Sequence, residues 1–145
     1  MNHDTWRATV GAGTLLGDLT KRMYVAGNRA MAHRVCPQVG IGGHATIGGL
    51  GPSSRMWGAA LDHIEAVEVV LADSSIVRAS ATRYADVFWA IKGAGASFGV
   101  VTEFVVRTNG SLEKQYSILM DSPWVHGRSW PKVSSRGSIS SVIPA

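Results

Sequence analysis

The segment from Ala32 to Gly51, AHRVCPQVGIGGHATIGGLG, constrains the fold more than any other part of the chain. It contains the only cysteine, Cys36, and a run of glycines: Gly40, Gly42, Gly43, Gly48, Gly49 and Gly51. Glycine lacks a Cβ atom, so its backbone N–H groups can closely approach a flat or anionic ligand. Val39, Ile41 and Ile47 are interleaved with these glycines, and a solvated linker has no use for such apolar side chains. The segment is therefore predicted to pack closely against a flat or anionic ligand.

The composition is that of one folded domain. Apolar residues make up 46% of the 145 residues and charged residues 17%, which is the composition of a folded protein and not of a disordered acidic or basic chain. The net charge of +4 is spread thinly, in pairs such as Lys21 and Arg22, so we expect no nucleic-acid partner. No apolar run approaches the roughly 18 residues that cross a bilayer, so we expect no membrane partner. One cysteine permits no internal disulfide, so cysteine usage indicates neither an oxidising nor a reducing compartment for the protein.

The first part of the chain predicts a strand followed by a helix. Apolar residues alternate over Thr5–Gly13, which favours a strand. Thr14 is the expected N-cap of the helix, and Gly27 is its expected C-terminal stop. The buried face of this helix is expected to consist of Leu15, Leu19, Met23 and Ala26.

The second part predicts a hairpin, a helix and a strand. Two strands over Asp62–Ser80 are expected to meet at a turn at Asp73, Ser74 and Ser75. Asp62 and His63, where the hairpin begins, are expected to be structural. A helix is expected over Ala85–Lys92 with Gly93 after its last turn, and a β-branched strand over Gly99–Arg107. Residues 109–145 are expected to form a weakly ordered tail, with a further strand at Gln115–Met120.

Two other glycine clusters do not fit the dinucleotide-binding fingerprint. GAGTLLG and GAGASFG each place three residues between the second and third glycine, whereas the fingerprint has two. The acidic residue expected about twenty positions later is also missing, because Arg34, Val35 and Cys36 stand there. We therefore expect no nicotinamide-binding unit and interpret GAGTLLG as a strand-to-helix turn.

The motifs CPQVGIGGH, then GGLG, DHI and DVFWAIKGAGASFGVVTEF, occur in the order typical of a known family. They resemble the second half of the flavin-binding domain of the vanillyl-alcohol-oxidase and p-cresol-methylhydroxylase (PCMH) type. Within that type they are most similar to berberine-bridge-enzyme-like and glucooligosaccharide-oxidase-like proteins. The resemblance runs from about Ala8 to Thr108. It implies an α+β fold over residues 1–108: an incomplete PCMH-type domain, with a mixed sheet and flanking helices, before a divergent tail at 109–145.

The resemblance implies FAD as cofactor. In bicovalent members of the family this cysteine is bonded through sulfur to C6 of the isoalloxazine ring, and a histidine of an earlier loop to the 8α-methyl carbon. For Cys36 the alternative is a buried small side chain. The other expected contacts are Gly40, Gly42, Gly43, His44, Gly48, Gly49, Gly99, Val100 and Val101. A structural histidine bonded to backbone is an equal alternative for His44, and ordinary sheet pairing is one for Gly99–Val101.

Other parts of the family pattern are missing. No histidine stands in a loop like RSGGHS, no metal site is indicated, and no catalytic base can be assigned. The chain also has HRVC where many relatives have HGxC. Full-length relatives take a hydride from an alcohol or saccharide carbon onto flavin N5 while a base removes the hydroxyl proton, and oxygen accepts the electrons. We therefore expect a fragment, truncated at its N-terminus, with little or no turnover alone. A non-catalytic protein or an imperfect gene model is the alternative.

Overall fold

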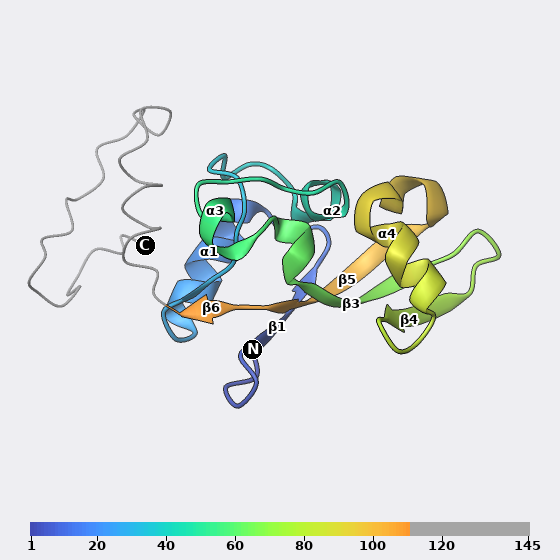
Figure 1. The fold of residues 1–145 in the computed structure, drawn as a ribbon, viewed down its shortest axis with the longest axis horizontal. Coiled ribbons are helices and arrows are strands. Elements are labelled where there is room, and N and C mark those ends of the chain that lie inside the picture. The colour runs from blue at the N-terminus through green and yellow to red at the C-terminus, as the bar shows by residue number, and fades with distance from the viewer. Residues whose placement is uncertain (111–145) are drawn as a thin grey trace, which may run out of the picture.

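The computed structural model describes residues 1–110, and Figure 1 shows their arrangement. The elements are β1 (Arg7–Gly11), α1 (Leu16–Val25), β2 (Arg29–Ala30), α2 (Ile41–Thr46), α3 (Ser54–Trp57), a 3-10 helix η1 (Ala60–His63), β3 (Ile64–Val70), β4 (Ile76–Ser80), α4 (Ala85–Phe98), β5 (Val100–Arg107) and β6 (Asn109–Gly110). The expected strand at Gln115–Met120 and the remainder of the expected tail after Gly110 lie outside the described residues. No helix within 1–110 is long and apolar enough to cross a membrane.

A four-stranded sheet in the order β1–β5–β3–β4 organises the fold, and β2 pairs separately with β6. The α+β class is confirmed. Each described pairing is antiparallel, whereas the resemblance led us to expect a mixed sheet. The central strand is β5, where Phe104 lies opposite Val10 of β1 on one side and Val67 of β3 on the other. The last long strand described is therefore held between the first strand and the hairpin.

The sheet has one apolar and one charged face, as alternation along each strand dictates. Helices α1, α2 and α4 pack on the apolar face and share one core with it. The core contains Ala8, Val10, Leu16, Leu19, Met23, Ile41, Ala45, Val67, Val69, Phe88, Ile91, Phe104 and Val106. An ion pair between Arg7 of β1 and Glu65 of β3 spans the intervening strand β5. Another joins the neighbouring strands β3 and β4 through Glu68 and Arg78, whose Oε2 and Nε atoms lie 3.0 Å apart.

The hairpin is confirmed as β3 and β4, and its turn has the expected chemistry. The Asp73 carboxylate accepts hydrogen bonds from the backbone N–H and the hydroxyl of Ser75, at 2.9 and 2.6 Å. Ser74 has a left-handed backbone with φ of 67°. The first and last predicted strands are also present, although the first is shorter than predicted and β5 begins one residue later.

The predicted start of α1 is wrong, and the reason is tertiary. Thr14 does not cap the helix, because the N–H groups of Leu16 and Gly17 donate to the carbonyls of Val39 and Pro37, at 2.9 and 3.1 Å. The buried face consequently uses Leu16 in place of Leu15, together with Leu19 and Met23. Gly27, with φ of 144°, follows the last turn as predicted.

Helix α4 extends beyond its predicted end. The backbone leaves helical geometry at Lys92, Gly93 and Ala94, and the chain then forms a second helical segment that ends at Phe98. The predicted stop at Gly93 is therefore a kink, with φ of 134° at that glycine. Helix α2 was not predicted, since the glycines in IGGHAT have low intrinsic helix propensity.

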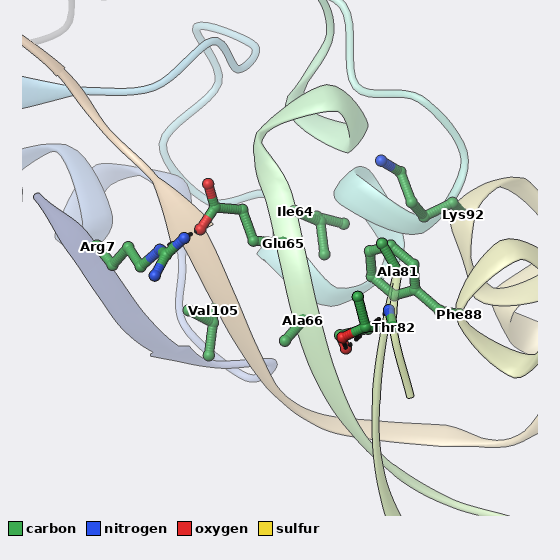
Figure 2. A pocket seen from close by; sticks show the side chains of 10 residues that line it. Arg7, Ile64, Glu65, Ala66, Ala81, Thr82, Phe88, Lys92 and Val105 are labelled. Atoms are coloured by element: carbon green, nitrogen blue, oxygen red, sulfur yellow. Dashed lines mark hydrogen bonds and ion pairs between the residues drawn. The ribbon is translucent and has the colours of Figure 1, made fainter. Parts of the chain in front are cut away.

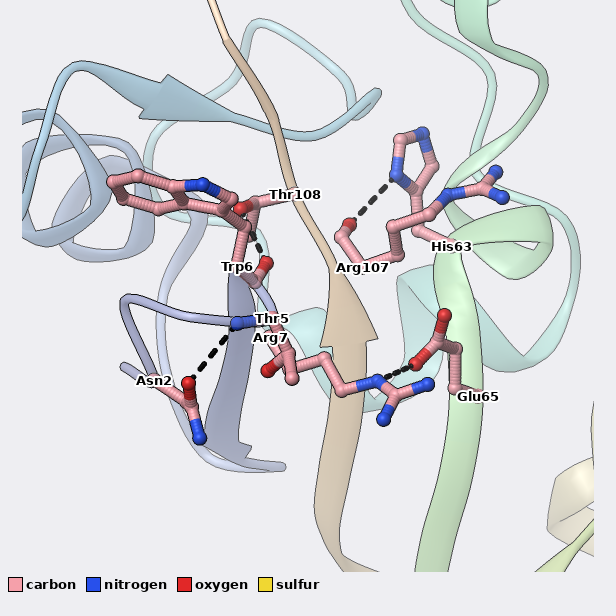
Figure 3. A network of polar contacts seen from close by, with 8 residues as sticks. All are labelled: Asn2, Thr5, Trp6, Arg7, His63, Glu65, Arg107 and Thr108. Carbon is pink, nitrogen blue, oxygen red and sulfur yellow. Dashed lines mark hydrogen bonds and ion pairs between the residues drawn. The ribbon is translucent and has the colours of Figure 1, made fainter.

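A clasp of Trp6, Arg29 and Thr108 joins the two ends of the described chain. Figure 3 shows two of its members, Trp6 and Thr108. The Arg29 guanidinium lies 4.4 Å from the Trp6 ring centroid and donates from Nη2 to the Thr108 carbonyl at 2.5 Å. Thr108 in turn donates from its hydroxyl and its N–H to the Trp6 carbonyl, at 2.6 and 3.1 Å. The clasp therefore fixes where β1 begins relative to the end of β5.

Replacing Phe104 by alanine is expected to destabilise the chain by about 3–5 kcal/mol, because its ring is fully buried in the core. The matched control is Trp89→Ala, whose side chain is 80% exposed and which should change stability by less than about 0.5 kcal/mol. Urea unfolding followed by circular dichroism measures both values. Equal effects of the two substitutions would contradict the assignment of the core.

Candidate functional site

The loop of residues 34–40, here called the Cys36 loop, lies against the start of α1. Besides the two hydrogen bonds from Leu16 and Gly17, contact is so close that a Cβ on Gly17 would stand 2.8 Å from the Cβ of Pro37. Cys36 itself is exposed, and its Sγ lies 3.7 Å from Oε1 of Gln38. The loop thus presents the thiol at the surface, and the buried-side-chain alternative is not what the structure shows.

Helix α2 is attached at its start to the turn that precedes α1. The N–H of Ile41 donates to the Thr14 carbonyl at 2.9 Å, and the N–H of Gly42 donates to the Ala12 carbonyl at 3.0 Å. A Cβ on Gly42 would lie 2.8 Å from the Ala12 oxygen, so only glycine permits this bond. We call these two bonds, together with those donated by Leu16 and Gly17, the reciprocal caps. The loop that precedes α2 supplies carbonyls to the start of α1, and the turn that precedes α1 supplies carbonyls to the start of α2.

The reciprocal caps show whether the GAGTLLG turn is free to bind a phosphate. A bound phosphate would need the first free N–H groups of α1, and two of them are engaged by the Cys36 loop. Thr14 also donates its N–H back to Gly11 at 3.0 Å. These bonds are those of the strand-to-helix turn that we predicted.

The glycines fall into two classes according to what a Cβ would meet. Gly42, Gly49 and Gly99 are filled: atoms of the chain stand within 3 Å of the added carbon. Gly13, Gly40 and Gly43 are open, with no atom within 4 Å, and none of them has a left-handed backbone. Within residues 1–110, no packing or dihedral constraint therefore accounts for glycine at these three positions, which we call the open glycines.

The open glycines surround the reciprocal caps. Gly13 lies between the two acceptor residues of the turn, and Gly40 and Gly43 flank the two donor residues of α2. Large apolar side chains in the same segments are also exposed, among them Ile47 at 74% and Leu50 at 70%. Bare backbone beside exposed apolar side chains suits a flat aromatic ring system. Gly13 was absent from the predicted contacts, although GAGTLLG contained the signal.

The remaining predicted contacts have partners within the chain. Gly48 and Gly49 accept hydrogen bonds from Leu61 and Ala60 at the start of η1, both at 2.9 Å. Val100 pairs with Val70, while Val101 packs against the core, so this part of β5 shows ordinary sheet pairing. These hydrogen bonds and packing contacts are compatible with a cofactor contact at each of these positions.

His44 and His63 show the backbone contacts of structural residues. His44 is buried, and its Nε2 accepts the N–H of Arg34 at 3.2 Å. His63 is fully buried and bridges the N–H of Ala32 and the Arg107 carbonyl, at 3.2 and 3.0 Å. Burial lowers the pKa of each imidazole below its usual value, because the charged form loses solvation.

A hollow of about 620 Å³ lies elsewhere, lined by residues of β1, β3 and β5, the end of β4 and α4. Figure 2 shows Phe88 and Lys92 on one side of it and the Arg7–Glu65 ion pair on the other. None of the predicted cofactor contacts lines this hollow. The part of the chain described here also contains no group of His, Cys, Asp or Glu side chains that could hold a metal ion.

Comparison with known proteins shows the family of the chain and its cofactor. The family profile for the FAD binding domain matches residues 1–80. The chain belongs to the FAD-binding domain family. The predicted membership of the PCMH-type family and the predicted cofactor, FAD, are confirmed.

Curated relatives include the FAD-linked oxidoreductase sorD of Penicillium rubens, 51% identical over 74% of this chain and 23% of that protein. Another is the xylooligosaccharide oxidase of Thermothelomyces thermophilus, 41% identical over 87% of this chain and 25% of that protein. A solved structure of the glucooligosaccharide oxidase of Acremonium strictum, described as carrying 6-S-cysteinyl, 8α-N1-histidyl FAD, is 42% identical with a TM-score of 0.72, covering 74% of this chain and 22% of that one. The chain thus spans about a quarter of the length of these relatives.

Alanine substitutions at the neighbouring Gly42 and Gly43 should separate packing from cofactor contact. Gly42→Ala is expected to lower stability by about 1–3 kcal/mol, because its Cβ meets the Ala12 backbone. Gly43→Ala should raise the stability of the FAD-free chain by up to about 1 kcal/mol, since alanine favours an exposed helical position.

Gly43→Ala should nevertheless weaken FAD binding, because its methyl group projects into open space beside the Cys36 loop. Thermal unfolding without FAD measures the stability effects, and quenching of flavin fluorescence measures binding. Unchanged FAD affinity in Gly43→Ala would show that the open glycines do not face the cofactor.

Proposed function

We propose that this chain is the part of a FAD-dependent oxidase of sugars or other alcohols that holds the isoalloxazine ring. The observation that carries the proposal is the set of open glycines next to the exposed thiol of Cys36. Relatives named as oxidases of xylooligosaccharide and glucooligosaccharide support a saccharide as substrate and oxygen as electron acceptor of the whole protein.

The proposed cofactor contacts are those predicted from the sequence, with Gly13 added. Gly40, Gly43 and Gly13 would let the ring lie against bare backbone, and Gly42 would hold α2 in place for this purpose. His44, Gly48, Gly49, Gly99, Val100 and Val101 complete the proposed set. FAD, when bound, supplies an electron-pair acceptor for the oxidation of an alcohol carbon. The chain's own part is to orient the ring and to exclude water from one side of it with apolar side chains such as Ile47.

We further propose that the Cys36 sulfur is bonded to C6 of the flavin. Cys36 is exposed, so its sulfur is accessible to a bound ring, and the thiolate is the nucleophilic form of a cysteine. Forming the S–C6 bond replaces the S–H and C6–H bonds and releases two protons and two electrons, which dioxygen accepts as peroxide. The 6-S-cysteinyl FAD named for glucooligosaccharide oxidase supports this bond.

We assign no catalytic base among residues 1–110. The buried imidazoles of His33 and His63 are hydrogen-bonded through both ring nitrogens, and Nε2 of His44 accepts the N–H of Arg34. Proton removal from a substrate would therefore depend on groups outside this part of the protein.

Replacing Cys36 by alanine should abolish covalent attachment of flavin. The wild-type chain, incubated with FAD in air and then precipitated with acid, should give a yellow pellet, whereas the Cys36→Ala pellet should be colourless. Trp89→Ala, at an exposed position of α4 that is not a proposed cofactor contact, is the control and should stay yellow. A yellow Cys36→Ala pellet would refute the sulfur bond. A wild-type chain that binds no FAD at all would refute the proposed function and favour the non-catalytic alternative.

The purified chain is expected to form no saccharide-dependent peroxide when supplied with FAD and an oligosaccharide, because no base is assigned within the described residues. A peroxidase-coupled colour assay measures this directly, and a full-length sugar oxidase serves as the positive control. Peroxide formation that depends on both the chain and the saccharide would contradict the expectation.

A further inference from the structure

The segment Ala32–Arg34 connects β2 to the Cys36 loop without joining either sheet, although Ala32 and His33 are buried. Backbone N–H groups in such a position need acceptors, since an unpaired buried amide is costly. Side chains supply them here: the N–H of Ala32 donates to Nε2 of His63, and the N–H of Arg34 donates to Nε2 of His44, both at 3.2 Å. Two imidazoles from different elements therefore replace the neighbouring strand that the segment lacks.

The hydrogen bonds define which protonation state and tautomer of each imidazole can accept the backbone N–H. Nδ1 of His63 faces the Arg107 carbonyl at 3.0 Å and must donate to it, which leaves the lone pair on Nε2 (Figure 3). Nε2 of His44 must likewise carry a lone pair to accept from Arg34. A protonated imidazole has N–H groups on both nitrogens and cannot accept. Each amide is thus held only by a neutral ring.

We propose that His44 and His63 are positioning residues that hold the Ala32–Arg34 segment, and with it the Cys36 loop, through their neutral imidazoles. The part that concerns flavin rests on the proposed function of Cys36. The hydrogen bonds to Arg34 and Ala32 are independent of it and can be measured without any cofactor.

The charged and titratable groups around the two rings oppose their protonation. Burial is the largest cause that lowers the pKa of His44, and the nearby Arg34 charge adds to it. Burial also dominates at His63, where the Arg107 charge lowers the pKa further while the Arg107 carbonyl and Asp62 raise it. Burial is also the largest cause that lowers the pKa of His33, which lies between Ala32 and Arg34. The Arg34 carbonyl raises that pKa, and His44 and His63 lower it further.

The direction of the pH effect follows from these shifts. A histidine with a lowered pKa in the folded chain binds fewer protons there than in the unfolded chain. Its contribution is complete above the ordinary value of about 6.5 and is lost as the pH falls through the lower folded pKa. Acid should therefore release the segment before it unfolds the sheet.

Substituting glutamine or leucine at position 44 distinguishes a role in accepting a hydrogen bond from a role in packing alone. Glutamine Oε1 lies as many bonds from Cα as histidine Nε2, accepts a hydrogen bond and does not titrate. Leucine fills similar space and accepts nothing. His44→Gln and His44→Leu are therefore the two variants to compare, with His63→Gln and His63→Leu as the equivalent pair for Ala32.

Amide hydrogen exchange measured by NMR, as protection factors between pH 7 and pH 5, tests the proposal. At pH 7, His44→Leu should lose roughly tenfold protection at Arg34, the effect of one hydrogen bond, while His44→Gln keeps it. As the pH falls, wild type should lose protection at Arg34 and His44→Gln should not. The amides of Val67 and Phe104 in the central sheet report global unfolding.

Identical pH profiles of wild type and His44→Gln at Arg34 would overturn the proposal, even if the leucine variant fails to fold. Protection that His44→Gln retains at pH 5 and wild type loses would support it. Acid-stable flavin attached to wild type and His44→Gln, but reduced in a folded His44→Leu, would extend it to the Cys36 loop. If wild type attaches no flavin, the proposed function fails while the amide result still decides the role of the histidines.

Discussion

The reciprocal caps at the starts of α1 and α2 are the interaction on which the rest of the site depends. Neither helix has a side-chain cap, so the first N–H groups of each need carbonyls from elsewhere. The Cys36 loop supplies them to α1, and the Ala12–Thr14 turn supplies them to α2. Ala12 in turn donates to Thr102 of β5 at 2.9 Å. The position of the thiol is consequently set by the sheet, through two short relays of backbone bonds.

The glycines of this region serve two different purposes, and the distinction is physical. At Gly42 the missing Cβ admits a carbonyl of the chain itself, so the residue belongs to the architecture. At Gly43, one position later, the missing Cβ leaves free surface. A glycine-rich motif read as a unit would assign both to the cofactor. The structure separates them, because only one of the two has a neighbour that demands it.

The sequence alone predicted the elements whose signals are local. The hairpin follows from Asp73 and Ser75, and the strand at Gly99–Arg107 from its β-branched residues. The start of α1 and the existence of α2 could not be predicted, because carbonyls distant in sequence stabilise both and override the low propensity of glycine. For the site, the family motif identified Cys36 and its glycines, whereas only the three-dimensional neighbours distinguish Gly13 and Gly43 from Gly42.

The clasp of Trp6, Arg29 and Thr108 has a mechanical consequence. Polypeptide entering before Trp6 and polypeptide leaving after Thr108 meet at one corner of the unit, so a pull on both flanks would load the clasp first. The bonds around the Cys36 loop would carry little of that force. Because its two ends lie close together, such a unit can be inserted into a longer chain, and the neighbouring segments can vary without changing its internal geometry.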